Sequence, residues 1–130
     1  HFGHLVFLES VAKNIQEEAG DDCFIIIGLN SDKSAKKLKR PYSLINNYSE
    51  RAYILSLFPF IDFIFSFDTV DFSKQILEIS PTFYCKAANS ESELNPKEFK
   101  ALSDCGSTIR LIEPNPFYST AKIIEKIKNA

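Results

Sequence analysis

Short apolar runs alternate with helix-like segments along the chain, and this alternation is the strongest constraint on its fold. The run from Cys23 to Leu29 is continuous and bounded by polar residues, which is typical of a strand covered on both faces at the centre of a sheet. Further strands are predicted at 61–67, 82–86 and 108–112. Parallel strands need crossover helices, and right-handed crossovers place helices on both faces. The pattern predicts an α/β fold with a Rossmann-like doubly wound parallel sheet.

Capping signals mark where the helices between these strands begin and end. Gly20 follows the first apolar stripe, where a left-handed helix stop is expected. Asn47 and Glu50 have the spacing of a capping box, and Asn95 and Ser119 are expected N-caps. Helices are therefore predicted from about residue 5 to 19, at 33–40, 48–58, 72–79 and 96–104, and after Ser119.

No linker, repeat or second domain interrupts the pattern, so residues 1–130 are predicted to form a single domain. Four strands can be found, and the first helix has no strand before it. We therefore expect a sheet of about five strands whose first strand lies upstream of His1, which would make the domain N-terminally incomplete. The sequence contains no Met, which fits a start further upstream.

Composition narrows the class of protein. Fifteen Lys and Arg residues face 17 Asp and Glu residues, which disfavours a nucleic-acid coat, and no apolar run approaches the ~20 residues that cross a bilayer. Cys23, Cys85 and Cys105 contain no C-x-x-C pair, which argues against a disulfide framework and a zinc site. We expect a cytoplasmic protein with no resident metal, and we expect Cys23 and Cys85 to be inert core residues.

Ligands of doubly wound sheets bind at the carboxyl ends of the strands, where helix N-termini attract anions. His1 and His4 flank Gly3 at the start of the first helix, where imidazole N–H groups could stabilise a phosphoryl oxygen and the glycine would allow close approach. From spacing alone, a purification-tag remnant, a metal-binding pair and two incidental surface histidines are alternatives.

Two further segments carry groups that suit phosphates. Five cations lie between Lys33 and Arg40, including Lys39, and could form a phosphate-binding flap, although a solvated helix face is by itself the simpler explanation. Ser119 and Thr120 begin the last helix. They are first of all an N-cap, and the same hydroxyl and N–H groups can hold a phosphate.

Taken in order, these segments resemble the cytidylyltransferase-like nucleotidyltransferases, whose signature is H-x-G-H at the first helix. The chain looks most like the heptose 1-phosphate adenylyltransferase domains of that family, and next like the glycerol-3-phosphate cytidylyltransferases. The supporting stretches span nearly the whole chain and are His1–His4, Gly28–Asp32, Lys36–Lys39, Ser49–Arg51, Ile61–Phe67 and Ser119–Ile124.

The resemblance implies that a sugar or polyol phosphate attacks the α-phosphate of a nucleoside triphosphate, usually with Mg²⁺, and that pyrophosphate leaves. It favours ATP over CTP and a product that is a lipopolysaccharide precursor, and it permits a homodimer. By the match, the catalytic residues are His1, His4 and Lys39. The nucleotide- and phosphate-binding residues are Gly3, Asn30, Asp32, Arg51, Lys86, Asn89, Ser119 and Thr120.

The chain departs from the heptose enzymes at Lys86-Ala87-Ala88-Asn89, where their pattern is a Lys, two glycines and an Asp. Two methyl groups occupy positions where backbone may approach the nucleotide closely. The departure leaves open a changed base or sugar preference, weaker binding, or a catalytically silent nucleotide-binding module.

Overall fold

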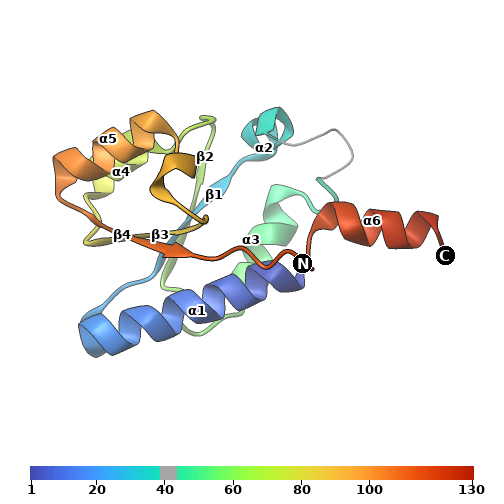
Figure 1. Cartoon of the computed structure of the whole chain (residues 1–130), viewed down its shortest axis with the longest axis horizontal. Coiled ribbons are helices and arrows are strands. Elements are labelled where there is room, and N and C mark those ends of the chain that lie inside the picture. Colours follow the sequence, from blue (N-terminus) through green and yellow to red (C-terminus); the bar gives the residue numbers. More distant parts are fainter. Residues whose placement is uncertain (39–43) are drawn as a thin grey trace. The chain divides into compact units, whose positions relative to one another are not determined.

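The computed structural model describes residues 1–38 and 44–130, and Figure 1 labels the helices and strands along the chain. It divides into two compact units, one formed by His1–Val11 with Asp71–Ala130 and the other by Ala12–Val70. Helix α1 (Phe2–Ala19) begins in the first unit and ends in the second. It stops at Gly20, whose φ of 68° is the left-handed conformation expected there.

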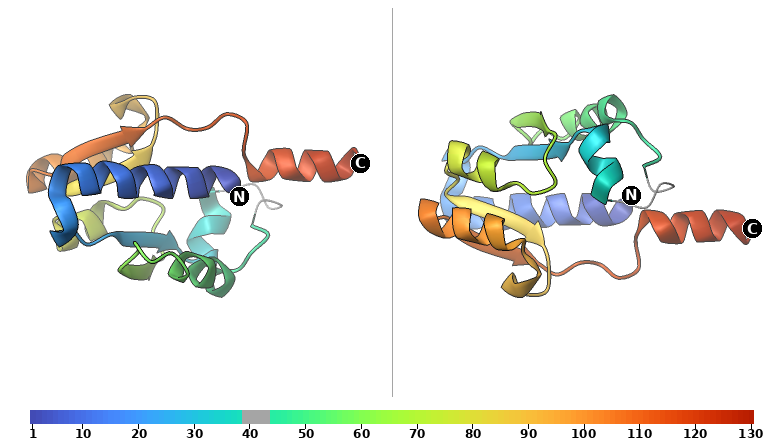
Figure 2. Two further views of the ribbon diagram at one scale, coloured as in Figure 1. Left: turned by 90° about the horizontal axis from the view of Figure 1, so that it is seen from below. Right: turned by 90° about the horizontal axis from the view of Figure 1, so that it is seen from above.

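The unit of residues 12–70 is built on a parallel strand pair, β1 (Ile26–Asn30) and β2 (Phe63–Phe67). A 3-10 turn (Gly20–Asp22) leads from α1 toward β1. Helix α2 (Asp32–Leu38) packs on β1, and α3 (Tyr48–Ser56) packs on both strands, as the views of Figure 2 also show. The expected βα alternation therefore positions the polar residues that follow β1.

Local hydrogen bonds fix both helices of this unit. The Ser31 hydroxyl accepts from the Ser34 N–H at 3.2 Å, which caps the start of α2, and the buried Ser34 hydroxyl donates to the Phe67 carbonyl at the end of β2. At α3 the predicted capping box is confirmed. The Asn47 side chain accepts from the Glu50 N–H at 3.0 Å, and the Glu50 carboxylate accepts from the Asn47 N–H at 2.8 Å.

The unit of residues 1–11 and 71–130 holds the second parallel pair, β3 (Phe83–Ala87) and β4 (Thr108–Ile112). Helices α4 (Ser73–Ile79) and α5 (Pro96–Cys105) lie side by side (Figure 1). Their contact buries the core of the unit, to which Phe72, Tyr84, Cys105 and Ile109 add a half-buried layer. The core residues are Ile76, Ala101 and Leu102.

The ends of α5 follow the sequence signals. Asn95 accepts from the Lys97 N–H at 2.9 Å, and Gly106 ends the helix with a φ of 66°. A short 3-10 turn (Glu91–Glu93) lies between β3 and α5. The last helix, α6 (Thr120–Lys128), begins at the predicted cap, where the Ser119 hydroxyl accepts from the Lys122 N–H at 3.2 Å.

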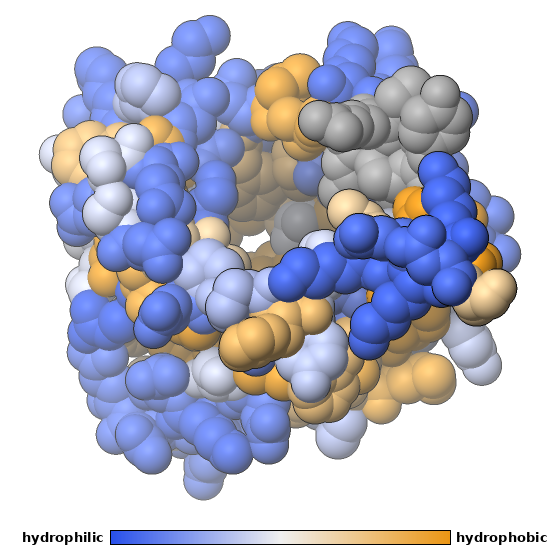
Figure 3. Space-filling view, turned by 45° about the vertical axis from the view of Figure 1, so that its right-hand side comes forward, coloured by the Kyte–Doolittle hydropathy of each residue, from blue (hydrophilic) through white to orange (hydrophobic). Residues whose placement is uncertain are grey.

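The α/β class and the order of the elements are confirmed. The prediction that the first strand is covered on both faces is not confirmed. The run at 23–29 forms a ladder only from Ile26 onward, and the Phe24 side chain that precedes it is 71 % exposed. Apolar side chains also show at the surface in Figure 3. A continuous apolar run indicates a strand, yet it does not say which residues a neighbouring element covers.

Within the described residues, the four strands form two parallel pairs, which is consistent with a Rossmann-like fold. A single doubly wound sheet of about five strands stays a prediction. No helix in the described ranges 1–38 and 44–130 has the length and apolar character needed to span a membrane.

Candidate nucleotide-binding site

The two histidines at the start of α1 face each other. Their rings stack with centroids 3.8 Å apart and an interplanar angle of 21°. The His4 N–H donates to the His1 carbonyl at 2.9 Å, so residues 1 to 4 form the first turn of the helix. Residues three apart lie on the same side of a helix, and the H-x-G-H spacing therefore brings both imidazoles together.

Gly3 permits a close approach between this turn and the segment before α6. A Cβ at Gly3 would lie 3.1 Å from two atoms of the His1 ring and 3.2 Å from the Tyr118 Cβ. These distances are shorter than ordinary van der Waals contacts, so a side chain would push His1 or Tyr118 away. The sequence analysis predicted that a phosphate approaches Gly3 closely. In the structure, the side chains of His1 and Tyr118 lie close to Gly3 instead.

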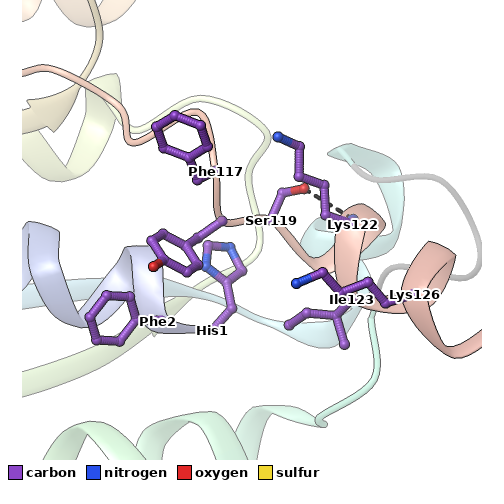
Figure 4. A pocket seen from close by; sticks show the side chains of 8 residues that line it. His1, Phe2, Phe117, Ser119, Lys122, Ile123 and Lys126 are labelled. Atoms are coloured by element: carbon purple, nitrogen blue, oxygen red, sulfur yellow. Dashed lines mark hydrogen bonds between the residues drawn. The ribbon is translucent and has the colours of Figure 1, made fainter.

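A cavity of about 70 Å³ opens beside the histidine turn (Figure 4). His1 and Phe2 border it from the start of α1, and Phe117 and Tyr118 border it from the segment before α6. The Phe2 and Tyr118 rings meet edge to face at 4.7 Å between centroids. This geometry gives the cavity an aromatic wall with an imidazole at its margin.

The opposite side of the cavity comes from the start of α6 and contains two lysines that the sequence analysis did not select as site residues. Ser119, Lys122, Ile123 and Lys126 line it. The Lys122 ammonium hydrogen-bonds to the Pro116 carbonyl and lies 5.9 Å from the centre of the Phe117 ring. The i, i+4 spacing of Lys122 and Lys126 places both on the same face of the helix.

The side chains in the described lining of the cavity that can carry a charge near neutral pH are all basic. Its described lining offers an imidazole, two ammonium groups, a hydroxyl and the N-terminus of a helix, and contains no carboxylate. One ordered water needs roughly 10–15 Å³, whereas pockets for whole small molecules measure roughly 300–1,000 Å³. A space of 70 Å³ therefore suits one or two phosphate groups better than a whole nucleotide.

Lys86 and Asn89 lie in the same unit but do not line this cavity. The Lys86 ammonium is 2.9 Å from the Glu98 carboxylate, whose side chain is only 6 % exposed. The Tyr84 hydroxyl donates to the same oxygen at 3.1 Å, and the Phe72 N–H donates to the other oxygen at 2.9 Å. Burial, and then the Glu98 charge, raise the pKa of the Tyr84 phenol well above its usual range.

The departure at 87–89 has a structural role. The Ala88 N–H donates to the Ile112 carbonyl at 3.1 Å, and its side chain is buried, so this methyl group packs inside the unit. The Asn89 amide and backbone N–H both donate to the Glu93 carboxylate, at 3.1 and 3.3 Å. Asn89 therefore closes the turn after β3.

Asn30, Asp32 and Arg51 belong to the other unit. The Asn30 amide donates to the Ser34 hydroxyl at 3.2 Å, and the Arg51 guanidinium donates to the Asp32 carboxylate at 2.8 Å. A hydrogen bond from the Tyr48 backbone, followed by the one from Arg51, holds the pKa of Asp32 below its usual range. Lys39 lies outside the described residues.

Thus the structure brings His1 and Ser119 to one cavity, and Thr120 follows as the first residue of α6. His4 stacks on His1 and Gly3 lies against His1 and Tyr118, although neither of the two lines the cavity. In the part of the chain that the structure describes, no three His, Cys, Asp or Glu side chains converge as metal ligands would.

Comparison with known proteins gives related sequences over the whole chain, although no protein-family model matches it. The bifunctional protein HldE of Campylobacter jejuni subsp. doylei is 37 % identical over 129 residues, or 99 % of the chain. The proteins of the same name from Campylobacter concisus and Campylobacter fetus are 35 % and 33 % identical over 100 % and 98 % of the chain. In each case the chain spans 25 % of the relative's length.

The chain therefore belongs to the cytidylyltransferase-like nucleotidyltransferases, the class that its H-x-G-H turn and its capped last helix resemble. Within that class it is a homologue of one quarter-length segment of bifunctional protein HldE.

Proposed function

We propose that the chain transfers a nucleotidyl group from a nucleoside triphosphate to a sugar phosphate, with ATP and a heptose 1-phosphate as the substrates. The cavity that joins the histidine turn to the start of α6 carries this proposal, because its charges and size suit phosphate groups. Similarity to HldE over the whole chain supports the same activity. The product is an NDP-sugar of the kind used in lipopolysaccharide precursors.

The chemistry is an attack by the acceptor phosphate oxygen on the α-phosphorus, with departure of pyrophosphate. The protein positions the reactants and stabilises charge, as in phosphoryl transfer generally. His1 and His4 donate ring N–H groups to oxygens of the reacting α-phosphate. Ser119, Thr120 and the free N–H groups of α6 hold the β- and γ-phosphates. Arg51 and Lys39 add positive charge for the acceptor or triphosphate, and no covalent intermediate on the protein is needed.

Mg²⁺ accompanies the triphosphate in this proposal. The described lining of the cavity offers it no carboxylate, so triphosphate oxygens and water would supply its ligands, as they often do for this ion. It would neutralise phosphate charge. Binding and orientation at the cavity remain the task of the imidazoles, hydroxyl groups and lysines.

We also propose the finer feature of the fold prediction, which is one doubly wound sheet of about five strands. The parallel sense of both strand pairs supports this proposal. A cytoplasmic location and a homodimer belong to the same proposal.

The test is pyrophosphate release by the full-length natural protein with ATP, CTP, GTP or UTP, each with heptose 1-phosphate or glycerol 3-phosphate. We expect release with ATP and the heptose phosphate, and His4→Ala should lower it about hundredfold or more, as loss of a transition-state donor does. Gln16→Ala, an exposed change on the same helix, is the control and should keep full activity.

Equal turnover by the His4→Ala variant would overturn the role of the imidazole. Release with CTP and glycerol 3-phosphate alone would instead identify a polyol phosphate cytidylyltransferase. Nucleotide binding without pyrophosphate release in any combination would contradict the transferase and support a silent module, for which Ala87, Ala88 and Asn89 are the motivation.

A further inference from the structure

We propose that Lys126 binds the two phosphates that leave as pyrophosphate, and so adds to the affinity of the site for the triphosphate. This inference rests on the proposed function, whose motifs do not include Lys126. The residue lines the cavity from the second turn of α6, and its side chain points into the cavity toward the side where His1 lies (Figure 4).

Helix geometry explains how a residue so far along α6 reaches the phosphates. Lys126 follows the cap Ser119 by seven residues, which is about 10 Å along the helix axis. Side chains tilt toward the N-terminus of their helix, so the flexible lysine arm extends back over the preceding turn. The ammonium group therefore reaches the cavity from the side opposite the imidazoles.

The other lysine on this face of α6, Lys122, already has interaction partners within the protein. The Lys122 ammonium binds the Pro116 carbonyl and contacts the Phe117 ring, so it holds the segment before α6 in place. Among the described residues, Lys126 has neither a hydrogen bond nor an ion pair with its side chain. It is thus the cation of this cavity that remains available to a ligand.

The proposed positions of the other groups assign the phosphates. The imidazoles lie at the start of α1, where the reacting α-phosphate is proposed to bind, and Ser119, Thr120 and the N-terminus of α6 are proposed to hold the β- and γ-phosphates. Lys126 lines the same cavity from α6, so its ammonium group adds positive charge to the two phosphates that leave as pyrophosphate.

The experiment measures binding of inorganic pyrophosphate to the full-length natural protein by calorimetry, because this probe does not depend on the base or the acceptor. Lys126→Ala should weaken pyrophosphate binding about tenfold and raise the KM for the triphosphate by a similar factor, while binding of AMP, which has no β- or γ-phosphate, stays the same. Lys126→Arg should restore most of the affinity, because it keeps the charge and reach.

Lys128→Ala is the matched control, since it removes the same charge from the same helix at an exposed position outside the cavity lining. Equal losses in the two variants, or no loss in Lys126→Ala, would overturn the inference even if pyrophosphate is released normally. If no substrate pair releases pyrophosphate but Lys126 still controls its binding, the anion site stands and the proposed function fails.

Discussion

Glu98 joins three elements through one buried carboxylate. It accepts hydrogen bonds from the Phe72 backbone, the Tyr84 hydroxyl and the Lys86 ammonium, and its side chain is 6 % exposed. A carboxylate at this depth is stable only while its donors are present. The network therefore fixes the end of β3 against α5, and it holds the Lys86 side chain against Glu98.

The change Glu98→Gln keeps the shape of the side chain and removes its charge. We expect it to lower the free energy of unfolding by about 2 kcal/mol, since charge-assisted bonds are lost while the 37 % exposed Lys86 can still reach water. Urea unfolding measures this loss. Asp104→Asn is the same chemical change on the same helix, at a 50 % exposed partner of Lys100, and should cost less than about 0.5 kcal/mol. Similar losses in both variants would show that burial does not distinguish the two carboxylates.

Asp32 predicts a dependence of stability on pH. Its pKa is held below the ordinary value of 3.8, so the folded state favours the carboxylate more than the unfolded chain does. The resulting stabilisation is present above the unfolded pKa and is lost as the pH falls through the folded pKa. Urea midpoints at pH 7, 4 and 3 should therefore show Asp32→Asn less stable than the wild type at pH 7, with the difference shrinking toward pH 3. A constant difference across this range would contradict the assignment.

At the scale of elements, the capping box of α3 tests how much one local hydrogen bond contributes to the stability of the fold. Asn47→Ala removes the acceptor of the Glu50 N–H and should destabilise the chain by about 1 kcal/mol, measured as a shift of the urea midpoint. Asn46→Ala alters the neighbouring exposed amide and should leave the midpoint nearly unchanged. Equal shifts would mean that the cap bond contributes nothing to the folded state.

Helix starts and stops could be predicted because each depends on one or two residues and nearby backbone. Asn95, Ser119 and Gly106 act within a single turn, and their effects need no distant partner. Strand limits could not be predicted as well, since a strand exists only where its partner pairs with it. Phe24 is as apolar as the residues of β1, yet the ladder begins at Ile26 opposite Phe63.

The residues of the candidate site also divide into those that could be predicted from the sequence and those that could not. His1, His4 and Ser119 could be chosen from the sequence because family motifs lie at helix starts. Lys126 could not be chosen, because its role depends on which face of α6 meets the aromatic segment before it. The buried carboxylate of Glu98 was also missed, since nothing in its neighbourhood along the chain indicates that the Phe72 backbone and two side chains of β3 converge on it.

At the scale of the whole molecule, helix α6 stands out because it supplies much of the cavity while none of its residues is buried, and Ile127 is 70 % exposed. A helix of nine residues is marginal by itself, since so few backbone bonds must offset the cost of the first turn. An anion at the N-terminus of α6 binds the free N–H groups there and interacts favourably with the positive end of the helix dipole. Bound substrate would then stabilise the folded form of α6. While phosphate occupies the cavity, the amide protons of α6 exchange slowly with solvent, and they exchange faster once pyrophosphate has left.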